Sequence, residues 1–148
     1  MDYQIATHRE REIPPAAVRA LYRQEGWWPE RSEDDLAAVI GIGPAVGAWQ
    51  DDRLVGFARA VSDGHFRAYV EDVVVDKSCR GSGCGAALID ALHVELAGID
   101  VVSLFCHEDL AGFYRRVGYR FTSQRIAHRS GSDPTGAIDL SDETPRTP

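Results

Sequence analysis

The hydrophobic pattern at the start of the chain predicts one short strand followed by two helices. Residues 2–7 alternate apolar and polar side chains, which is typical of a half-buried strand. The prolines at 14 and 15 open a helix, because proline suits a first turn that does not use its missing N–H. That helix ends before residues 26–29 (GWWP), and Ser32 then caps a second helix, which ends at residues 41–44 (GIGP).

Three β-rich runs follow, at residues 45–50, 54–61 and 66–75. The turns between them are short, so we expect the three strands to be antiparallel neighbours. The third run ends in three consecutive valines, 73–75, and a continuous apolar run indicates burial on both faces of the sheet.

A glycine-rich loop and a helix connect this third strand to a strand at residues 101–106. The helix extends to about Leu96, with Gly98 as its C-cap. Strand, helix and strand form a βαβ unit, which makes the two strands parallel with a right-handed crossover. A short helix at 109–116 and a closing strand at 119–127 complete the pattern. The expected fold is therefore α+β, with a mixed, mostly antiparallel central sheet and one parallel βαβ crossover.

Composition and charge limit the classes of protein to consider. The 148 residues suit one domain, which we expect over residues 1–128, with a polar C-terminal tail over 129–148. A net charge of −7 argues against a nucleic-acid partner. No apolar run approaches the roughly 18 residues of a membrane span, and the N-terminus lacks a secretion signal. We therefore expect a cytoplasmic protein with neither nucleic acid nor membrane as a partner.

Cysteines and histidines give no sign of a metal or a disulfide framework. The cysteines Cys79, Cys84 and Cys106 are odd in number and contain no CxxC pair. The five histidines show no ligand spacing such as HExxH. We expect no metal site.

Residues 80–86, RGSGCGA, place three glycines directly before a helix. Main-chain N–H groups converge at such a point, the helix dipole adds positive charge, and glycines let a diphosphate approach closely. A P-loop is excluded because the chain has no Gly-Lys pair. The dinucleotide pattern GxGxxG/A is formally met by Gly81, Gly83 and Ala86. However, five residues separate Val75 from Gly81, and the acid expected near the end of the next strand is missing.

The loop also fits the pattern [Q/R]xxGx[G/A] through Arg80, Gly83 and Gly85, and here the chain resembles the GCN5-related N-acetyltransferase (GNAT) superfamily. Residues 111–119 (AGFYRRVGY) are similar to that superfamily's A-x-x-F-Y-x-x-x-G-F segment, with Tyr119 replacing the last Phe. The order of elements agrees over roughly residues 3–127.

This resemblance implies acetyl-CoA as the co-substrate. It also implies that the pantetheine arm pairs like an added strand in a splay between residues 73–75 and 101–106. Asp109 and Arg116 are candidates for the adenosine end. The residues expected to bind the cofactor are Val73, Val74, Val75, Arg80, Gly81, Ser82, Gly83, Cys84, Gly85, Ala86 and Phe113. Because superfamily members often pair, we also expect a homodimer.

Acetyl transfer to an amine requires a group that removes a proton, since an alkylamine is almost wholly protonated at pH 7. A carboxylate can take that proton, and Glu71 and Asp72 are the candidates. Strand alternation places them on opposite faces of the sheet. Residues 69–75 resemble the corresponding strand of diamine and polyamine acetyltransferases, which implies that Glu71 faces the substrate as the general base. The superfamily resemblance implies that Tyr114 lies beside the sulfur of coenzyme A and protonates the leaving thiolate.

Residues 54–63 and 105–113 look instead like plant and bacterial arylalkylamine acetyltransferases. The two resemblances agree on a small primary amine and differ on which one. Trp27 and Trp28 would form a wall of the acceptor pocket beside Glu71. The predicted activity is direct acetyl transfer from acetyl-CoA to a primary amine of a small molecule. Two alternatives stay open, a non-catalytic acetyl-CoA-binding sensor or subunit and a protein or peptide N-acetyltransferase.

Overall fold

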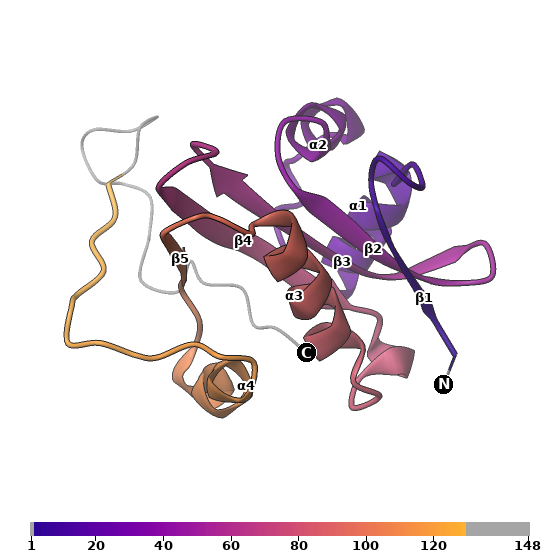
Figure 1. The fold of residues 1–148 in the computed structure, drawn as a ribbon. Coiled ribbons are helices and arrows are strands. Elements are labelled where there is room, and N and C mark those ends of the chain that lie inside the picture. The colour runs from indigo at the N-terminus through magenta and orange to yellow at the C-terminus, as the bar shows by residue number, and fades with distance from the viewer. Residues whose placement is uncertain (1, 130–148) are drawn as a thin grey trace.

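The computed structural model describes residues 2–129, which form one five-stranded sheet with helices on both faces (Figure 1). In chain order the elements are β1 (Gln4–Thr7), α1 (Pro15–Glu25), α2 (Glu33–Ile40), β2 (Ala45–Gln50), β3 (Arg53–Ser62), β4 (Arg67–Val75), a 3₁₀ turn (Lys77–Cys79), α3 (Cys84–Glu95), β5 (Val101–Leu104), a second 3₁₀ turn (Glu108–Leu110) and α4 (Ala111–Arg116).

The strands lie in the order β1-β2-β3-β4-β5. The first four are antiparallel neighbours, and β5 runs parallel to β4 after the crossover through α3. The predicted mixed, mostly antiparallel sheet with one parallel βαβ crossover is therefore confirmed.

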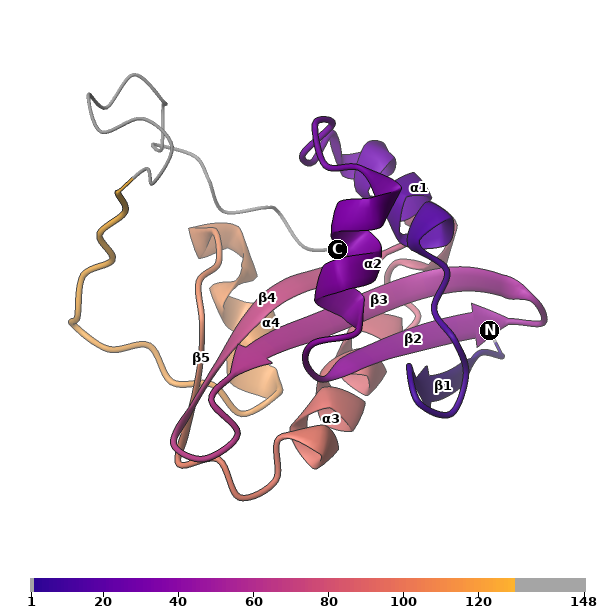
Figure 2. The ribbon, with the colours of Figure 1, turned by 90° about the horizontal axis from the view of Figure 1, so that it is seen from above.

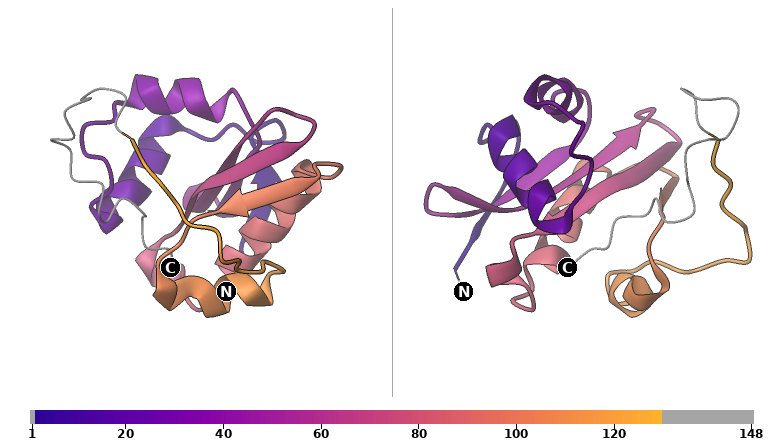
Figure 3. Two further views of the ribbon diagram at one scale, coloured as in Figure 1. Left: turned by 90° about the vertical axis from the view of Figure 1, so that its left-hand side faces the viewer. Right: turned by 180° about the vertical axis from the view of Figure 1, so that it is seen from behind.

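Each face of the sheet has its own apolar core. On one face α3 packs through Leu88 and Leu92 against strand residues that include Val73 and Val75. On the other face α1 and α2 cover a second core around Phe57. Figure 2 shows α2 in front of the strands with α3 on the opposite side, and the left panel of Figure 3 shows the helices on both faces of the sheet. Any side chain on β4 can thus be assigned to the α3 face or to the α1 face.

The helices on the α1 face begin where the sequence predicts. Pro15 occupies the first turn of α1. Ser32 caps α2 by accepting a hydrogen bond from the backbone N–H of Asp35 at 3.1 Å, and the Asp35 side chain accepts one from the backbone N–H of Ser32. Gly26 ends α1 in a left-handed conformation, with φ of +71°, which glycine adopts without strain. The residues that follow Gly26 therefore turn away from the helix axis.

The closing strand expected at residues 119–127 does not form, and that prediction was wrong. Within the described residues this segment has no ladder, so β5 is an edge of the sheet. Phe121 and Ile126 are 45% and 51% exposed. They are five positions apart and would point to opposite faces of a strand, so the segment offers no single apolar face to a core. The predicted tail lies outside the described residues except for Arg129, and the domain boundary at 128 stays a prediction.

Candidate active site

The glycine loop connects the end of β4 to the first residue of α3. Gly81 and Gly83 have φ of +72° and +88°, a region in which side chains other than glycine are strained. At Gly85 an added Cβ would lie 3.4 Å from the Phe113 ring, a van der Waals contact, so α3 packs closely against α4 at this position. The first-turn N–H groups of α3 therefore remain open to an anion at the helix N-terminus.

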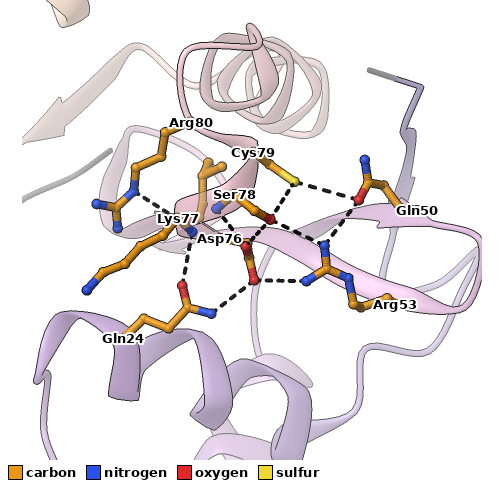
Figure 4. Close-up of polar contacts among 9 residues, drawn as sticks. Gln24, Gln50, Arg53, Asp76, Lys77, Ser78, Cys79 and Arg80 are labelled. Carbon is orange, nitrogen blue, oxygen red and sulfur yellow. Dashed lines mark hydrogen bonds and ion pairs between the residues drawn. The ribbon is translucent and has the colours of Figure 1, made fainter.

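A polar network fixes the start of this loop (Figure 4). Asp76 accepts hydrogen bonds from the Ser78 backbone N–H at 2.9 Å and from Gln24 at 2.9 Å, and it forms an ion pair with Arg53 at 3.0 Å. Gln24, in α1, also accepts a hydrogen bond from the backbone N–H of Lys77 at 3.0 Å. The network thereby joins α1 and β3 to the residues that precede the glycines.

The same network makes stability depend on pH. Burial alone would raise the pKa of Asp76, but hydrogen bonds from Ser78 and Gln24 and the charge of Arg53 lower it to about 2. Its stabilising contribution is therefore complete above its ordinary pKa of 3.8 and is lost as the pH falls towards 2. We expect the free energy of unfolding to fall by about 2 kcal/mol over this interval because of Asp76. Urea titrations of wild type and Asp76→Asn at pH 5 and pH 2.5 measure it, and equal pH dependence in both proteins would contradict the assignment.

Arg80, the first residue of the predicted loop motif, reaches back toward α1. Its Nε donates to the Val75 carbonyl at 3.3 Å, and its guanidinium forms an ion pair with Glu25. Ser82 donates a hydrogen bond to the Cys79 carbonyl. The Arg80 and Ser82 side chains therefore stabilise the loop through contacts with nearby backbone and with α1.

A cleft of about 900 Å³ lies between the loop and α4. Of the residues predicted to bind the cofactor, those that line it are Val75, Arg80, Gly81, Gly83, Gly85, Ala86 and Phe113. Asp109 and Arg116, assigned from the sequence to the adenosine end, also line it. Sequence reasoning missed Asp90 and Val117, which join the wall only because α3 and α4 come together. Its volume lies near the upper end of the range that is usual for small-molecule and cofactor sites.

The other residues predicted to bind the cofactor do not line this cleft. Val74 is fully buried in the core under α1, so only its main chain can contact a ligand. Val73 belongs to the core on the α3 face. Cys84 is 1% exposed, and burial together with the nearby Cys79 raises the pKa of its thiol to about 11. A thiol that stays protonated at neutral pH is a poor nucleophile, which disfavours a covalent route through Cys84.

The sheet opens at Glu71, as the predicted splay requires. The parallel pairing between β4 and β5 covers only Arg67–Val70 against Val101–Leu104. From Glu71 onward, β4 is paired only with β3 among the described strands. The β5-facing main chain of residues 73–75 is thus placed to pair with an extended, amide-bearing ligand.

A β-bulge at Glu71 corrects the expected orientation of the two carboxylates. Arg59 pairs with Asp72 and Ala60 pairs with Val70, so Glu71 is an extra residue in the ladder. Val70 and Val73 both lie in the core on the α3 face. The two residues between them therefore face α1, and Arg59 contacts both carboxylates, at 2.8 Å for Asp72 and 3.8 Å for Glu71. The prediction of opposite faces was wrong because the bulge interrupts the alternation.

The two carboxylates have different surroundings. Asp72 is 1% exposed and accepts a hydrogen bond from the Tyr22 hydroxyl at 2.6 Å in addition to the one from Arg59. The Glu71 side chain, by contrast, is 22% exposed. Burial, followed by the charge of Asp72, raises the pKa of Glu71, and Arg59, Arg31 and a hydrogen bond with Tyr69 oppose part of that rise. Glu71 is thus the more accessible of the two carboxylates, and its surroundings raise its pKa.

Two tryptophans pack against Tyr22, the tyrosine that donates a hydrogen bond to Asp72. Trp27 and Trp28 are half-buried and lie 5.7 and 5.5 Å from the Tyr22 ring, measured between centroids. The guanidinium of Arg31 lies 3.7 Å from the Trp28 ring centroid. The two tryptophans, predicted to form a wall of the acceptor pocket, therefore pack against the residue that holds Asp72.

Tyr114 lies in the α3-face core, in the same cluster as Val73 and Val75, and is 2% exposed. Its ring packs edge-on against Phe113 at 5.0 Å and Tyr119 at 5.8 Å. The side chain is therefore packed in the same core as the two valines of the opened strand.

Within residues 2–129 no group of three or more histidine, cysteine or acidic side chains is arranged to hold a metal ion. None of the helices in this range is both long and apolar enough to cross a membrane.

Comparison with known proteins identifies the family. The model of the acetyltransferase (GNAT) domain matches residues 43–121, which contain the bulge, the glycine loop and α4. The chain therefore belongs to the GNAT acetyltransferase family. The match spans more than half of the chain, and the resemblance inferred from the loop motif is confirmed.

Two curated relatives and one solved structure illustrate the range of similarity. Serotonin N-acetyltransferase 2, chloroplastic, of rice is 36% identical over 119 residues, covering 74% of this chain and 58% of the relative. Histone acetyltransferase TAP1 of soybean is 34% identical over 123 residues, covering 74% of this chain and 53% of the relative. A Deinococcus radiodurans structure described as an acetyltransferase has a TM-score of 0.74 and 28% identity, covering 86% of this chain and 89% of its own. The chain spans little more than half the length of these two curated relatives.

Proposed function

We propose that the protein is an acetyl-CoA-dependent N-acetyltransferase that acts on a primary amine of a small molecule. The observation that carries this proposal is the opening of the sheet at Glu71. One strand supplies the accessible carboxylate, then main-chain groups that do not pair with β5, and then the glycine loop and its cleft. This order matches a ligand that carries a thioester, an amide-rich arm and a diphosphate.

In the proposed reaction Glu71 takes a proton from the acceptor ammonium group, directly or through water. The neutral nitrogen attacks the thioester carbonyl, so that a C–N bond forms and the C–S bond breaks. Tyr114 gives a proton to the departing thiolate. The acylated nitrogen then loses its second proton to solvent, from which Tyr114 is reprotonated. The raised pKa of Glu71 suits its role, because the best general base has a pKa near the working pH.

The surroundings of Glu71 favour an acceptor with one amino group and an aromatic body. Two arginines, Arg59 and Arg31, balance the two carboxylates, so the site lacks the excess negative charge that a polyamine would need. Trp27 and Trp28 offer aromatic surface next to it. The name of the rice relative, which specifies serotonin, supports the same class of amine.

The experiment that tests the function combines binding and turnover. We expect acetyl-CoA to raise the melting temperature, because a ligand that binds only the folded state stabilises it. We then expect thiol release with arylalkylamines, at a higher kcat/KM than with polyamines. Melting-temperature shifts without turnover on any amine or peptide would instead identify a non-catalytic acetyl-CoA-binding protein.

A protein or peptide acceptor is the second candidate, and the name of the soybean relative, a histone acetyltransferase, supports it. Histone-tail peptides in the same assay separate the two proposals. A peptide kcat/KM above that of every small amine would overturn the small-molecule assignment.

We also propose a homodimer and a cytoplasmic location. The free edge of β5 and the exposed Phe121 and Ile126 provide surface for a second copy. A monomer in sedimentation equilibrium at micromolar concentration would contradict pairing.

The free cysteines suit a reducing compartment, whereas names of relatives from rice and Arabidopsis specify the chloroplast, so fractionation of the source cells decides the location.

One variant pair tests the glycine loop directly. Gly83→Ala places a Cβ at φ of +88°, which costs about 1–2 kcal/mol unless the loop moves. Movement would redirect the N–H groups at the start of α3, so we expect the Kd for acetyl-CoA to rise about tenfold in calorimetry. Gly64→Ala is the matched control, because Gly64 has φ of +78° in the distant β3–β4 turn. Equal Kd values for both variants and wild type would exclude the loop as the diphosphate site.

A further inference from the structure

Arg59 lies between two carboxylates and engages them unequally. Its Nε donates to Asp72 at 2.8 Å, whereas its Nη2 is 3.8 Å from Glu71, beyond hydrogen-bond distance. The Tyr22 hydroxyl donates to the same Asp72 oxygen at 2.6 Å. Asp72 and Arg59 are 1% and 8% exposed, so the ion pair between them is almost free of competition from water.

The bulge creates this arrangement. In a regular strand Asp72 and Glu71 would lie on opposite faces, and Arg59 could contact only one of them. Because both carboxylates lie on the α1 face, the guanidinium of Arg59 can pair with either of them. A buried guanidinium requires an anion, because leaving it unpaired costs several kcal/mol. If Asp72 carried no charge, Glu71 would be the nearest remaining carboxylate.

A close pair between Arg59 and Glu71 would harm the reaction in two ways. It would occupy the carboxylate oxygen that must accept the proton of the amine. It would also stabilise the ionised form and so weaken Glu71 as a base. The observed separation of 3.8 Å leaves the Glu71 carboxylate without a hydrogen bond from Arg59, and Arg59 lowers the pKa of Glu71 less than a close pair would.

We propose that Asp72 is a positioning residue for acetyl transfer: it holds Arg59 by its Nε and keeps the guanidinium from closing onto Glu71. This inference rests on the proposed function, in which Glu71 is the general base. Asp72 itself is 1% exposed, so its effect on the reaction passes through Arg59 and not through contact with the acceptor.

The charged and titratable groups that act on Glu71 come from each element packed around it. Asp72 and Tyr69 lie on β4, Arg59 on β3, and Arg31 follows α1. Asp72 raises the pKa of Glu71, whereas Arg59, Arg31 and Tyr69 lower it. Removing the charge of Asp72 therefore lowers the pKa of Glu71 twice, by loss of repulsion and by closer approach of Arg59.

The test compares Asp72→Asn with the double variant Asp72→Asn/Arg59→Gln. In the single variant we expect kcat/KM to fall about tenfold and its acidic limb to move down by about one pH unit, with the same amine for all proteins. The double variant lacks the Arg59 guanidinium that Asp72→Asn would free to approach Glu71, so we expect most of the lost kcat/KM to return. The Kd for acetyl-CoA and the melting temperature of each variant report folding, because none of these residues lines the cofactor cleft.

The outcomes separate this inference from the function on which it rests. The inference is overturned if both variants fold and bind acetyl-CoA but the kcat/KM of the double variant is equal to or below that of the single variant. If Asp72 had only a structural role, the two substitutions would lower kcat/KM additively. A single variant with an unshifted acidic limb overturns it as well. If Glu71→Gln is as active as wild type, the proposed base is wrong. If the double variant does not fold, Asp72→Asn/Arg59→Met replaces it and is judged by the same rescue.

Discussion

Glu71→Gln is expected to lower kcat/KM for an amine acceptor about 10²- to 10⁴-fold, the usual contribution of a positioned general base. Glutamine keeps the size of the side chain and its place in the bulge, but it cannot accept the proton of the ammonium group. The cofactor cleft does not include residue 71, so the Kd for acetyl-CoA should stay the same. Thiol release at saturating acetyl-CoA measures the loss.

The pH profile gives this prediction a second readout. The base must be ionised, so the rate falls as the pH drops through the pKa of Glu71, which burial and the charge of Asp72 raise above the ordinary range for glutamate. In Glu71→Gln the fall of the rate at acidic pH that is due to Glu71 should disappear. Glu12→Gln removes one exposed carboxylate elsewhere and should change neither readout. Wild-type kcat/KM in Glu71→Gln would remove Glu71 from the mechanism.

Tyr114→Phe is expected to lower kcat about 10²-fold or more, because phenylalanine cannot protonate a thiolate. The variant keeps the ring that packs against Phe113 and Tyr119, so we expect it to stay folded. Since the acid must be protonated, wild-type kcat should also decline at high pH, and this limb should be absent from the variant. Steady-state kinetics across pH 6 to 10 with one amine test both points.

Tyr119→Phe is the matched control for this variant. Tyr119 packs on Tyr114 and hydrogen-bonds His93 at 2.8 Å, so its replacement perturbs the same core through a different hydroxyl. We expect its kcat to remain near that of wild type. Equal losses in the two variants would assign the effect to packing, and an unchanged kcat in Tyr114→Phe would exclude the residue as the acid.

Local signals in the sequence were sufficient for most of the fold and for the position of the glycine loop. Short turns and the βαβ unit predict the order and direction of β2, β3, β4 and β5, because each signal acts between neighbours in the chain. The positive φ values of Gly81 and Gly83 explain why glycine stands there, and the motif carries that information. The family model that matches residues 43–121 confirms the resemblance seen in these residues.

The arrangement around Glu71 was beyond sequence reasoning for a physical reason. Residues 69–75 (YVEDVVV) contain no glycine or proline to mark a bulge, so alternation alone places Glu71 and Asp72 on opposite faces. The contacts of Arg59 with both carboxylates depend on pairing between strands and leave no local pattern. The missing strand at 119–127 failed similarly, because its β-rich composition does not reveal whether a partner strand is available.

Helix α1 participates in both halves of the site. Gln24 and Glu25 hold the glycine loop through Lys77 and Arg80, while Tyr22 holds Asp72 on the acceptor side. In the proposed enzyme, redesign of acceptor preference by changes within this helix would therefore also disturb the loop proposed to bind the coenzyme. The left-handed Gly26 ends the helix, so residues 27–31 form a module that laboratory evolution could diversify while the coenzyme half remains intact.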